Sequence, residues 1–178
     1  MQTPLRLLVV DDENDMCLLL QKTLTRPNER QVDYANSAVE ATVKLDRQEY
    51  ALVLADYSLG PGQSGLDILF AAKARYPRCI TILMTGYDTD QLAIRAVAEG
   101  VYDYLTKPFE NLLAVKNTVD RGIRYYSLLL QYHEKCADEL AQQELLAQTL
   151  EKARRTQELL TILVEKLRLG NDPTQKKE

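Results

Sequence analysis

Short, mostly apolar runs alternate with longer amphipathic stretches over the first 125 residues of the chain. Runs of five or six residues with this composition are typical of strands that are buried in a sheet. One of the runs, residues 30–34, is more polar than the others. The predicted strands are residues 5–10, 30–34, 51–55, 79–84 and 101–106.

Between these runs, apolar residues recur at helical spacing. The predicted helices are residues 14–25, 37–48, 66–75 and 89–99. Ser37 opens one of them as a candidate N-cap, and Glu40, three residues later, gives a capping-box pattern. The regular alternation of strand and helix predicts an α/β fold, a doubly wound five-stranded parallel sheet with helices on both faces.

Polar side chains follow the predicted strands at the points where they end. Asp11 and Asp12 follow the first strand, Asp56 the third, Thr85 the fourth and Lys107 the fifth. The ligand sites of such sheets lie beyond the carboxyl ends of the strands, so we expect all five residues at one edge.

Carboxylates that lie close together repel each other unless a cation neutralises them, and their oxygen atoms suit Mg²⁺. A carboxylate beside Mg²⁺ can attack phosphorus and form an aspartyl phosphate. Lys107 would then supply a positive charge to a phosphoryl oxygen, and Thr85 a hydroxyl donor. The alternative interpretation is that these carboxylates are ordinary loop or helix-capping residues.

Four motifs contain these residues: VVDDE, LADYSLGPGQSGLDIL, ILMTGY and YDYLTKPF. In this order they resemble the receiver domain of two-component response regulators, over roughly residues 4–125. The resemblance implies a flavodoxin-like receiver fold. The loop from Asp56 to Gly65 is one residue longer than the commonest pattern of that family.

The resemblance also implies a role for each matching residue. Asp56 would be the phosphoacceptor and, with Asp11 and Asp12, would hold Mg²⁺. Asp12 would coordinate the ion directly and Asp11 through water, and the backbone carbonyl of Ser58 would be a further ligand.

Three more positions match residues that act after phosphorylation in the family. Thr85 would be the hydroxyl that moves to meet the phosphoryl group, and Lys107 would pair with the carboxylate and then with a phosphoryl oxygen. Tyr104 would be the aromatic residue that turns inward, although plain sheet packing remains an alternative for it. The bond from Lys107 to Pro108 is a candidate cis peptide.

The helical pattern after Pro108 continues well beyond the point, near residue 123, where a receiver domain should end. No proline interrupts it before Pro173, and Gly170 opens a typical C-terminal stop signal. A helix from residue 110 to residue 169 would be about 90 Å long. We therefore expect three segments: a receiver over 1–122, a coiled-coil helix over 123–169, and a disordered tail or linker over 170–178.

Such a helix needs a partner to cover its apolar stripe. The stripe predicts a parallel homodimeric coiled coil with one three-residue irregularity near Leu150, a stammer. An antiparallel hairpin and a solvated single helix remain alternatives. The predicted seam consists of Cys136, Leu140, Gln143, Ala147, Leu150, Ala153, Gln157, Leu160, Val164 and Leu167.

Composition narrows the function further. The net charge of −4 does not favour binding to nucleic acid. The sequence contains no run of eighteen apolar residues, so we expect no membrane span. Cys17, Cys79 and Cys136 are an odd, scattered set, typical of free thiols in a reducing compartment, so we expect a cytoplasmic protein.

The resemblance implies a response regulator rather than an enzyme, because a receiver catalyses only its own phosphorylation and dephosphorylation. Its partners would be a cognate sensor histidine kinase or phosphotransfer protein and a downstream effector, reached through the coiled coil. A stand-alone, phosphorylation-dependent interaction module is the alternative function. An effector enzyme beyond residue 178 also stays open.

Overall fold

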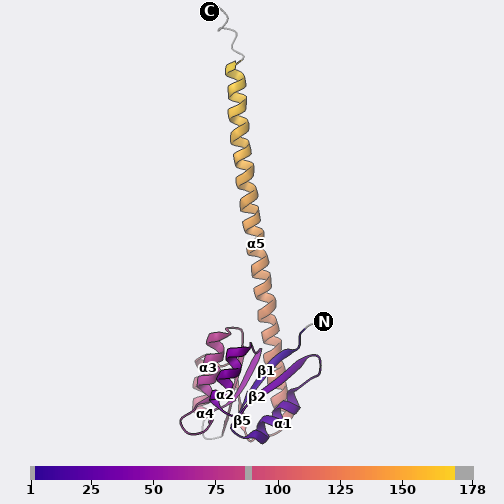
Figure 1. Ribbon diagram of the computed structural model, residues 1–178, viewed down its shortest axis with the longest axis vertical. Coiled ribbons are helices and arrows are strands. Elements are labelled where there is room, and N and C mark those ends of the chain that lie inside the picture. Colours follow the sequence, from indigo (N-terminus) through magenta and orange to yellow (C-terminus); the bar gives the residue numbers. More distant parts are fainter. Residues whose placement is uncertain (1–2, 87–89, 171–178) are drawn as a thin grey trace, which may run out of the picture. The chain divides into compact units, whose positions relative to one another are not determined.

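The computed structural model describes residues 3–86 and 90–170, and it contains the five strands and five helices that the sequence predicts (Figure 1). The strands are β1 (Leu5–Val10), β2 (Arg30–Ala35), β3 (Leu52–Asp56), β4 (Ile80–Gly86) and β5 (Asp103–Lys107). The helices are α1 (Asn14–Leu24), α2 (Ala38–Arg47), α3 (Gly65–Arg75), α4 (Asp90–Ala98) and α5 (Leu112–Gly170).

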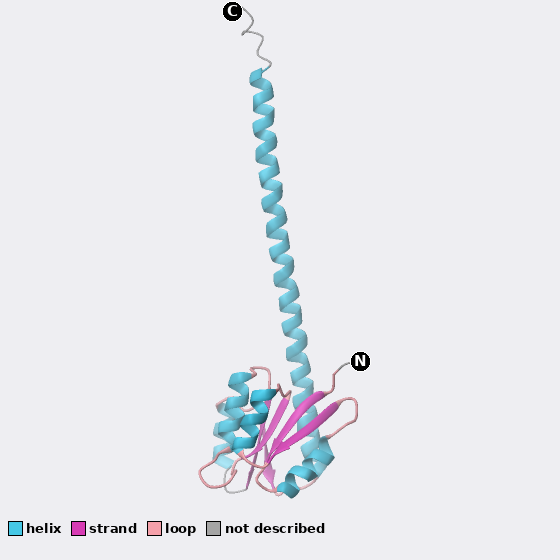
Figure 2. Cartoon of the chain, in the orientation of Figure 1, coloured by secondary structure: helices cyan, strands magenta, loops and turns pink. Residues whose placement is uncertain are grey.

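All strands are parallel and follow the order β2-β1-β3-β4-β5, which confirms the doubly wound α/β fold. Helices lie on both faces of the sheet (Figure 2). The register aligns Val10 of β1 with Ala55 of β3, and Asp56 with Met84 of β4. The carboxyl ends of the strands therefore meet at one edge.

Alternate residues of β1 to β4 fill two separate cores. Leu7 and Val9 of β1 point into a core that α1 and the first part of α5 cover. Leu8 and Val10 point into a second core, which α2, α3 and α4 cover. Because side chains alternate along a strand, one buried apolar run serves both faces.

The predicted cap of α2 is confirmed. The backbone N–H of Glu40 donates to Ser37 Oγ at 3.2 Å. The Glu40 carboxylate accepts the backbone N–H of Asn36 at 3.0 Å, one residue before the position that a standard capping box would use.

Gly65 allows β3 and α3 to approach closely. A Cβ atom at this position would lie 1.9 Å from the carbonyl oxygen of Asp56, a distance that no side chain tolerates. Gly60 and Gly62, in the loop before it, have φ angles of 95° and 75°, which favour glycine.

Residues 120–122 of α5 attach this helix to the opposite, amino edge of the sheet. Asp120 accepts hydrogen bonds from Arg30 at 2.6 Å and from Arg26 at 3.0 Å, and Arg121 pairs with Asp103. A Cβ at Gly122 would lie 3.0 Å from the side chains of both Leu52 and Ile80, so α5 packs directly on the sheet.

The chain forms two units that divide at Leu130. The first holds the sheet, α1 to α4 and the beginning of α5. In the second, which begins at Gln131, the described residues continue α5 to Gly170, and each side chain described over 131–165 is exposed. The boundary expected at residue 122 stays a prediction, and the tail expected beyond Gly170 lies outside the described residues.

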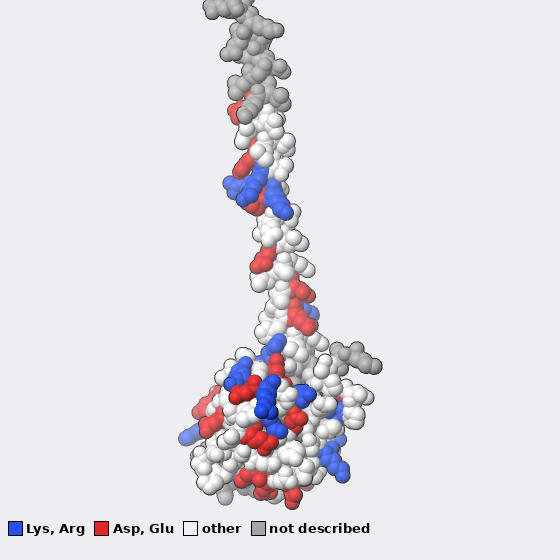
Figure 3. Space-filling view, viewed as in Figure 1, with Lys and Arg blue, Asp and Glu red and all other residues white. Residues whose placement is uncertain are grey.

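Along the helix of the second unit, acidic and basic side chains gather in small groups (Figure 3). Uncharged surface separates these groups from one another. Two of these pairs are ion pairs within the helix, Arg154 with Glu158 and Arg155 with Glu151. Within the described part of the chain, no helix is both long and apolar enough to cross a membrane.

Candidate functional site

A lysine lies between two aspartates at the carboxyl edge of the sheet. Lys107 Nζ, at the end of β5, lies 2.7 Å from Asp11 Oδ2 and 2.7 Å from Asp56 Oδ1. The two aspartates come from the ends of β1 and β3. The structure therefore brings together three of the residues that the sequence predicts at this edge.

The second oxygen of each carboxylate binds the backbone. Asp11 Oδ1 accepts the N–H of Glu13 at 3.0 Å, and Asp56 Oδ2 accepts the N–H of Ser58 at 3.0 Å. Asp11 is fully buried and Asp56 is 9% exposed. Both carboxylates are thus held in fixed orientations by their own strand-end loops.

Burial and charge perturb the ionisation of Asp56 and Lys107. Burial raises the pKa of Asp56, and the negative charge of Asp11 adds to this effect, while Lys107 opposes it. Burial acts to lower the pKa of Lys107, but hydrogen bonds and charge from Asp11 and Asp56 outweigh it, so that this pKa is raised. Lys107 therefore does not fully offset the effect of burial on the Asp56 carboxylate.

The other residues predicted at the site lie around this cluster. Asp12 is exposed, next to buried Asp11. Thr85 is buried near the end of β4, with its hydroxyl 3.5 Å from the carbonyl oxygen of Gly86. Tyr104 lies on the edge strand β5 and is 37% exposed. The bond between Lys107 and Pro108 is cis.

Oxygen donors for a divalent cation are available at this edge. Ser58 pairs with Ser64 in an isolated antiparallel bridge. The hydrogen bonds of the bridge are made by the flanking residues: the Gly65 N–H donates to the Tyr57 carbonyl, and the Leu59 N–H donates to the Gln63 carbonyl. The bridge therefore does not use the Ser58 carbonyl. Among the described residues, no three His, Cys, Asp or Glu side chains form a metal-binding group. Mg²⁺ needs only one or two carboxylates, with water as its other ligands, so the donor set fits this ion.

Two features of the site were not predicted. Asp11 contacts Lys107 directly, a pair that the sequence analysis did not name. The contact of Gly65 with the Asp56 carbonyl was also missed, although a glycine that opens a helix directly after a loop is a signal for such close approach.

A family model described as "Response regulator receiver domain" matches residues 7–117. The chain belongs to this family. The match begins within β1 and ends within α5, so the second unit lies outside it.

Curated relatives of this receiver are bacterial regulators. A putative NtrX-like response regulator of Rickettsia bellii is 33% identical over 104 residues, which cover 58% of this chain and 22% of the relative. The DNA-binding transcriptional regulator NtrC of Proteus hauseri is 31% identical over 122 residues, 66% of this chain and 24% of the relative. The chain thus spans about a quarter of the length of these relatives.

Solved structures share the receiver fold. A response regulator receiver domain protein of Clostridium thermocellum is 28% identical, with a TM-score of 0.62 over 70% of this chain and 98% of that one. A protein described as adenylate cyclase from Rhodopirellula baltica is 25% identical, with a TM-score of 0.68 over 75% of this chain and 98% of that one.

Proposed function

We propose that this receiver is phosphorylated on Asp56 by a sensor histidine kinase or a phosphotransfer protein. The observation that carries the proposal is the position of Asp56, at the end of β3, in contact with Lys107 and close to Asp11. Its carboxylate is fixed by the Ser58 N–H, and burial raises its pKa, with the charge of Asp11 adding to this effect and Lys107 opposing it.

In the proposed reaction an Asp56 carboxylate oxygen attacks the phosphorus of a phosphohistidine. A phosphorus–oxygen bond forms, the phosphorus–nitrogen bond breaks, and the donor imidazole leaves with its electron pair. Lys107 remains positively charged at neutral pH, because its pKa is raised, and can pair with a phosphoryl oxygen. The Thr85 hydroxyl would donate to another phosphoryl oxygen.

Mg²⁺ is the proposed cofactor, held by Asp12, by Asp56, by the Ser58 carbonyl and, through water, by Asp11. When bound, it would neutralise charge on the transferred phosphoryl group. The chain's own contribution is to hold the carboxylates and Lys107 in place before the donor arrives.

The proposed output is a change at Thr85 and Tyr104 that reaches a downstream effector through a dimeric coiled coil of α5. The exposed apolar side chains of the second unit support this proposal, because an apolar stripe on a helix needs a partner to cover it. The curated relatives also carry more than three quarters of their length outside the matched region, which is where an effector would lie.

Phosphorylation can be tested with a small phosphodonor such as acetyl phosphate in the presence of Mg²⁺. We expect the wild-type protein to gain acid-stable, base-labile phosphate and the Asp56→Asn variant to gain none. Asp138→Asn, which changes an exposed aspartate of the second unit, is the matched control and should behave as wild type. Equal labelling of Asp56→Asn and wild type would reject the proposal.

A further inference from the structure

A side chain from outside the predicted site holds the peptide that joins Asp11 to Asp12. Asn36 Nδ2 donates to the carbonyl oxygen of Asp11 at 3.1 Å. The thiol of Cys17 adds a longer contact to the same oxygen, at 3.4 Å, and a thiol is only a weak donor. Asn36 directly follows β2, a strand whose end carries none of the predicted site residues. β2 therefore reaches the site through Asn36.

The Asn36 amide takes over where the pairing of β1 with β2 ends. The last aligned pair is Val10 with Ala35, and the Asp11 N–H still donates to the Ala35 carbonyl at 3.1 Å. Beyond Ala35 the chain turns into α2, whose N-cap is Ser37. Asp11 is fully buried, and a buried carbonyl that loses its donor is costly. The amide of Asn36 therefore supplies a bond that a continuing strand would otherwise make.

α2 fixes Asn36 in turn. The Asn36 N–H donates to Glu40 Oε2 at 3.0 Å, and Glu40 Oε1 lies 3.2 Å from Lys44 Nζ. The bond from Asn36 is the largest cause that lowers the pKa of Glu40, and Lys44 adds to it, so this carboxylate is charged at neutral pH. The backbone and the side chain of Asn36 are thus both held, with the amide directed at Asp11.

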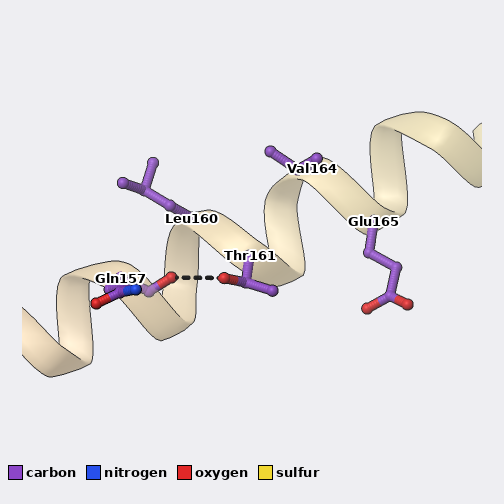
Figure 4. Close-up of a pocket in the computed structure, with 5 residues that line it drawn as sticks. All are labelled: Gln157, Leu160, Thr161, Val164 and Glu165. Carbon is purple, nitrogen blue, oxygen red and sulfur yellow. Dashed lines mark hydrogen bonds between the residues drawn. The ribbon is translucent and has the colours of Figure 1, made fainter.

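Side chains that donate to a backbone carbonyl are often local features of a helix. Thr161 shows this ordinary case in Figure 4, where its hydroxyl donates to the carbonyl of Gln157, one turn earlier, at 2.9 Å. Such a bond stays within its own helix. The bond from Asn36 spans 25 positions and joins the start of α2 to Asp11, which in turn contacts Lys107 at 2.7 Å.

We propose that Asn36 is a positioning residue for Mg²⁺: by fixing the peptide between Asp11 and Asp12, it sets the directions of both carboxylates. The inference deepens the proposed function and rests on its Mg²⁺ site. A peptide is planar, so a donor on the Asp11 carbonyl also orients the Asp12 N–H on the other side of the bond. Without this donor the two aspartates can turn relative to Asp56. Partners that orient metal ligands typically contribute about ten- to hundredfold in metal affinity.

The test measures Mg²⁺ binding by the full chain without a phosphodonor, from amide NMR spectra recorded as Mg²⁺ is added. Asn36→Ala removes the donor and should weaken binding about tenfold. Asn36→Asp keeps the shape of the side chain but also lacks the donor, and should weaken binding as well. Because an added negative charge by itself attracts a cation, weaker binding by Asn36→Asp separates positioning from charge.

Gln21→Ala is the matched control. Gln21 Nε2 donates to the carbonyl of Val32, within β2, at 2.8 Å, so the variant deletes the same kind of bond from the same strand. We expect this variant to bind Mg²⁺ with wild-type affinity. The bond to Glu40 uses only the backbone N–H of residue 36, which alanine and aspartate also supply. Both Asn36 variants should therefore fold, as circular dichroism melting checks.

Phosphate incorporation from acetyl phosphate, measured against Mg²⁺ concentration, gives a second readout. The half-saturating Mg²⁺ concentration should rise about tenfold in Asn36→Ala and stay at the wild-type value in Gln21→Ala.

The outcomes separate this inference from the proposed function. Wild-type Mg²⁺ affinity in both Asn36 variants would overturn the inference and leave the phosphorylation of Asp56 standing. Equal losses of affinity in Asn36→Ala and Gln21→Ala would also overturn it, because a merely structural role predicts that result. A wild-type chain that binds Mg²⁺ but takes up no phosphate would reject the phosphorylation of Asp56, and the NMR affinities would still decide the role of Asn36.

Discussion

At the scale of single residues, the surroundings of Asp56 disfavour the charged form of its carboxylate. Asp56 is buried beside Asp11, and Lys107 only partly offsets the effect on its pKa, which is raised from 3.8. The folded protein therefore binds a proton at Asp56 more tightly than the unfolded chain does. The contribution of Asp56 to the free energy of unfolding falls as the pH rises from 3.8 through the raised pKa.

Asp56→Asn replaces the charged group by a neutral one of the same shape, and should raise the free energy of unfolding at neutral pH. It should also remove the loss of stability that Asp56 causes as the pH rises from 3.8 through its raised pKa. Urea unfolding of both proteins across this range checks the prediction. A variant less stable than wild type at pH 7 would show that the contact with Lys107 outweighs burial.

The motif residues could be predicted because each lies at or next to a strand end, and strand ends are set by apolar runs that are visible in the sequence. The direct contact between Asp11 and Lys107 could not, because it joins residues 96 positions apart. Which of two adjacent aspartates is buried depends on the local path of the chain after β1, and neither composition nor spacing determines that path.

At the scale of elements, the junction between β3 and α3 depends on the absence of a side chain at Gly65. Gly65→Ala would place Cβ 1.9 Å from the Asp56 carbonyl oxygen, so the strand or the helix must move. We expect a loss of about 2–3 kcal/mol in the free energy of unfolding. Gly86→Ala, whose Cβ would meet no atom of the described residues within 4 Å, is the control and should change the free energy by less than about 0.5 kcal/mol.

Urea unfolding measures both variants. A tolerated Gly65→Ala, with stability equal to that of Gly86→Ala, would contradict the close packing of α3 on β3.

The attachment of α5 to the amino edge depends on Asp120. Asp120→Ala would leave the buried guanidinium of Arg30, whose side chain is only 4% exposed, without its carboxylate. We expect a loss of about 3 kcal/mol in the free energy of unfolding. Arg26→Ala removes the more exposed partner of the same carboxylate and should cost only about 0.5 kcal/mol.

Thermal and urea unfolding compare the two variants. Equal effects of Asp120→Ala and Arg26→Ala would show that the buried pair adds nothing beyond a surface ion pair. This attachment was not predicted from the sequence, since Arg30 and Asp120 lie 90 positions apart and neither belongs to a motif.

At the scale of the whole molecule, the two units differ in the burial of their side chains. All residues of the two cores lie in the first unit, and the side chains described over 131–165 of the second are exposed. The sequence showed that the helix extends beyond the receiver, because its pattern has no proline before residue 173. The seam that the sequence predicts along this helix stays a prediction.

A chain that ends at Leu130 should therefore keep the stability and the phosphorylation of the first unit, and should lose the dimer. Circular dichroism melting, phosphate incorporation and light scattering measure the three properties. A truncated chain that fails to fold would mean that the first unit needs the second. A truncated chain that still forms the same dimer would place the dimer contact outside residues 131–178.

The central claim is that Asp56 accepts the phosphoryl group, and the most direct measurement identifies the modified residue. Borohydride reduces an aspartyl phosphate to homoserine, which peptide mass spectrometry locates after treatment with acetyl phosphate and Mg²⁺. We predict homoserine at position 56 in the peptide that contains the end of β3. Homoserine at another aspartate, such as Asp11 or Asp12, or at none, would contradict the account.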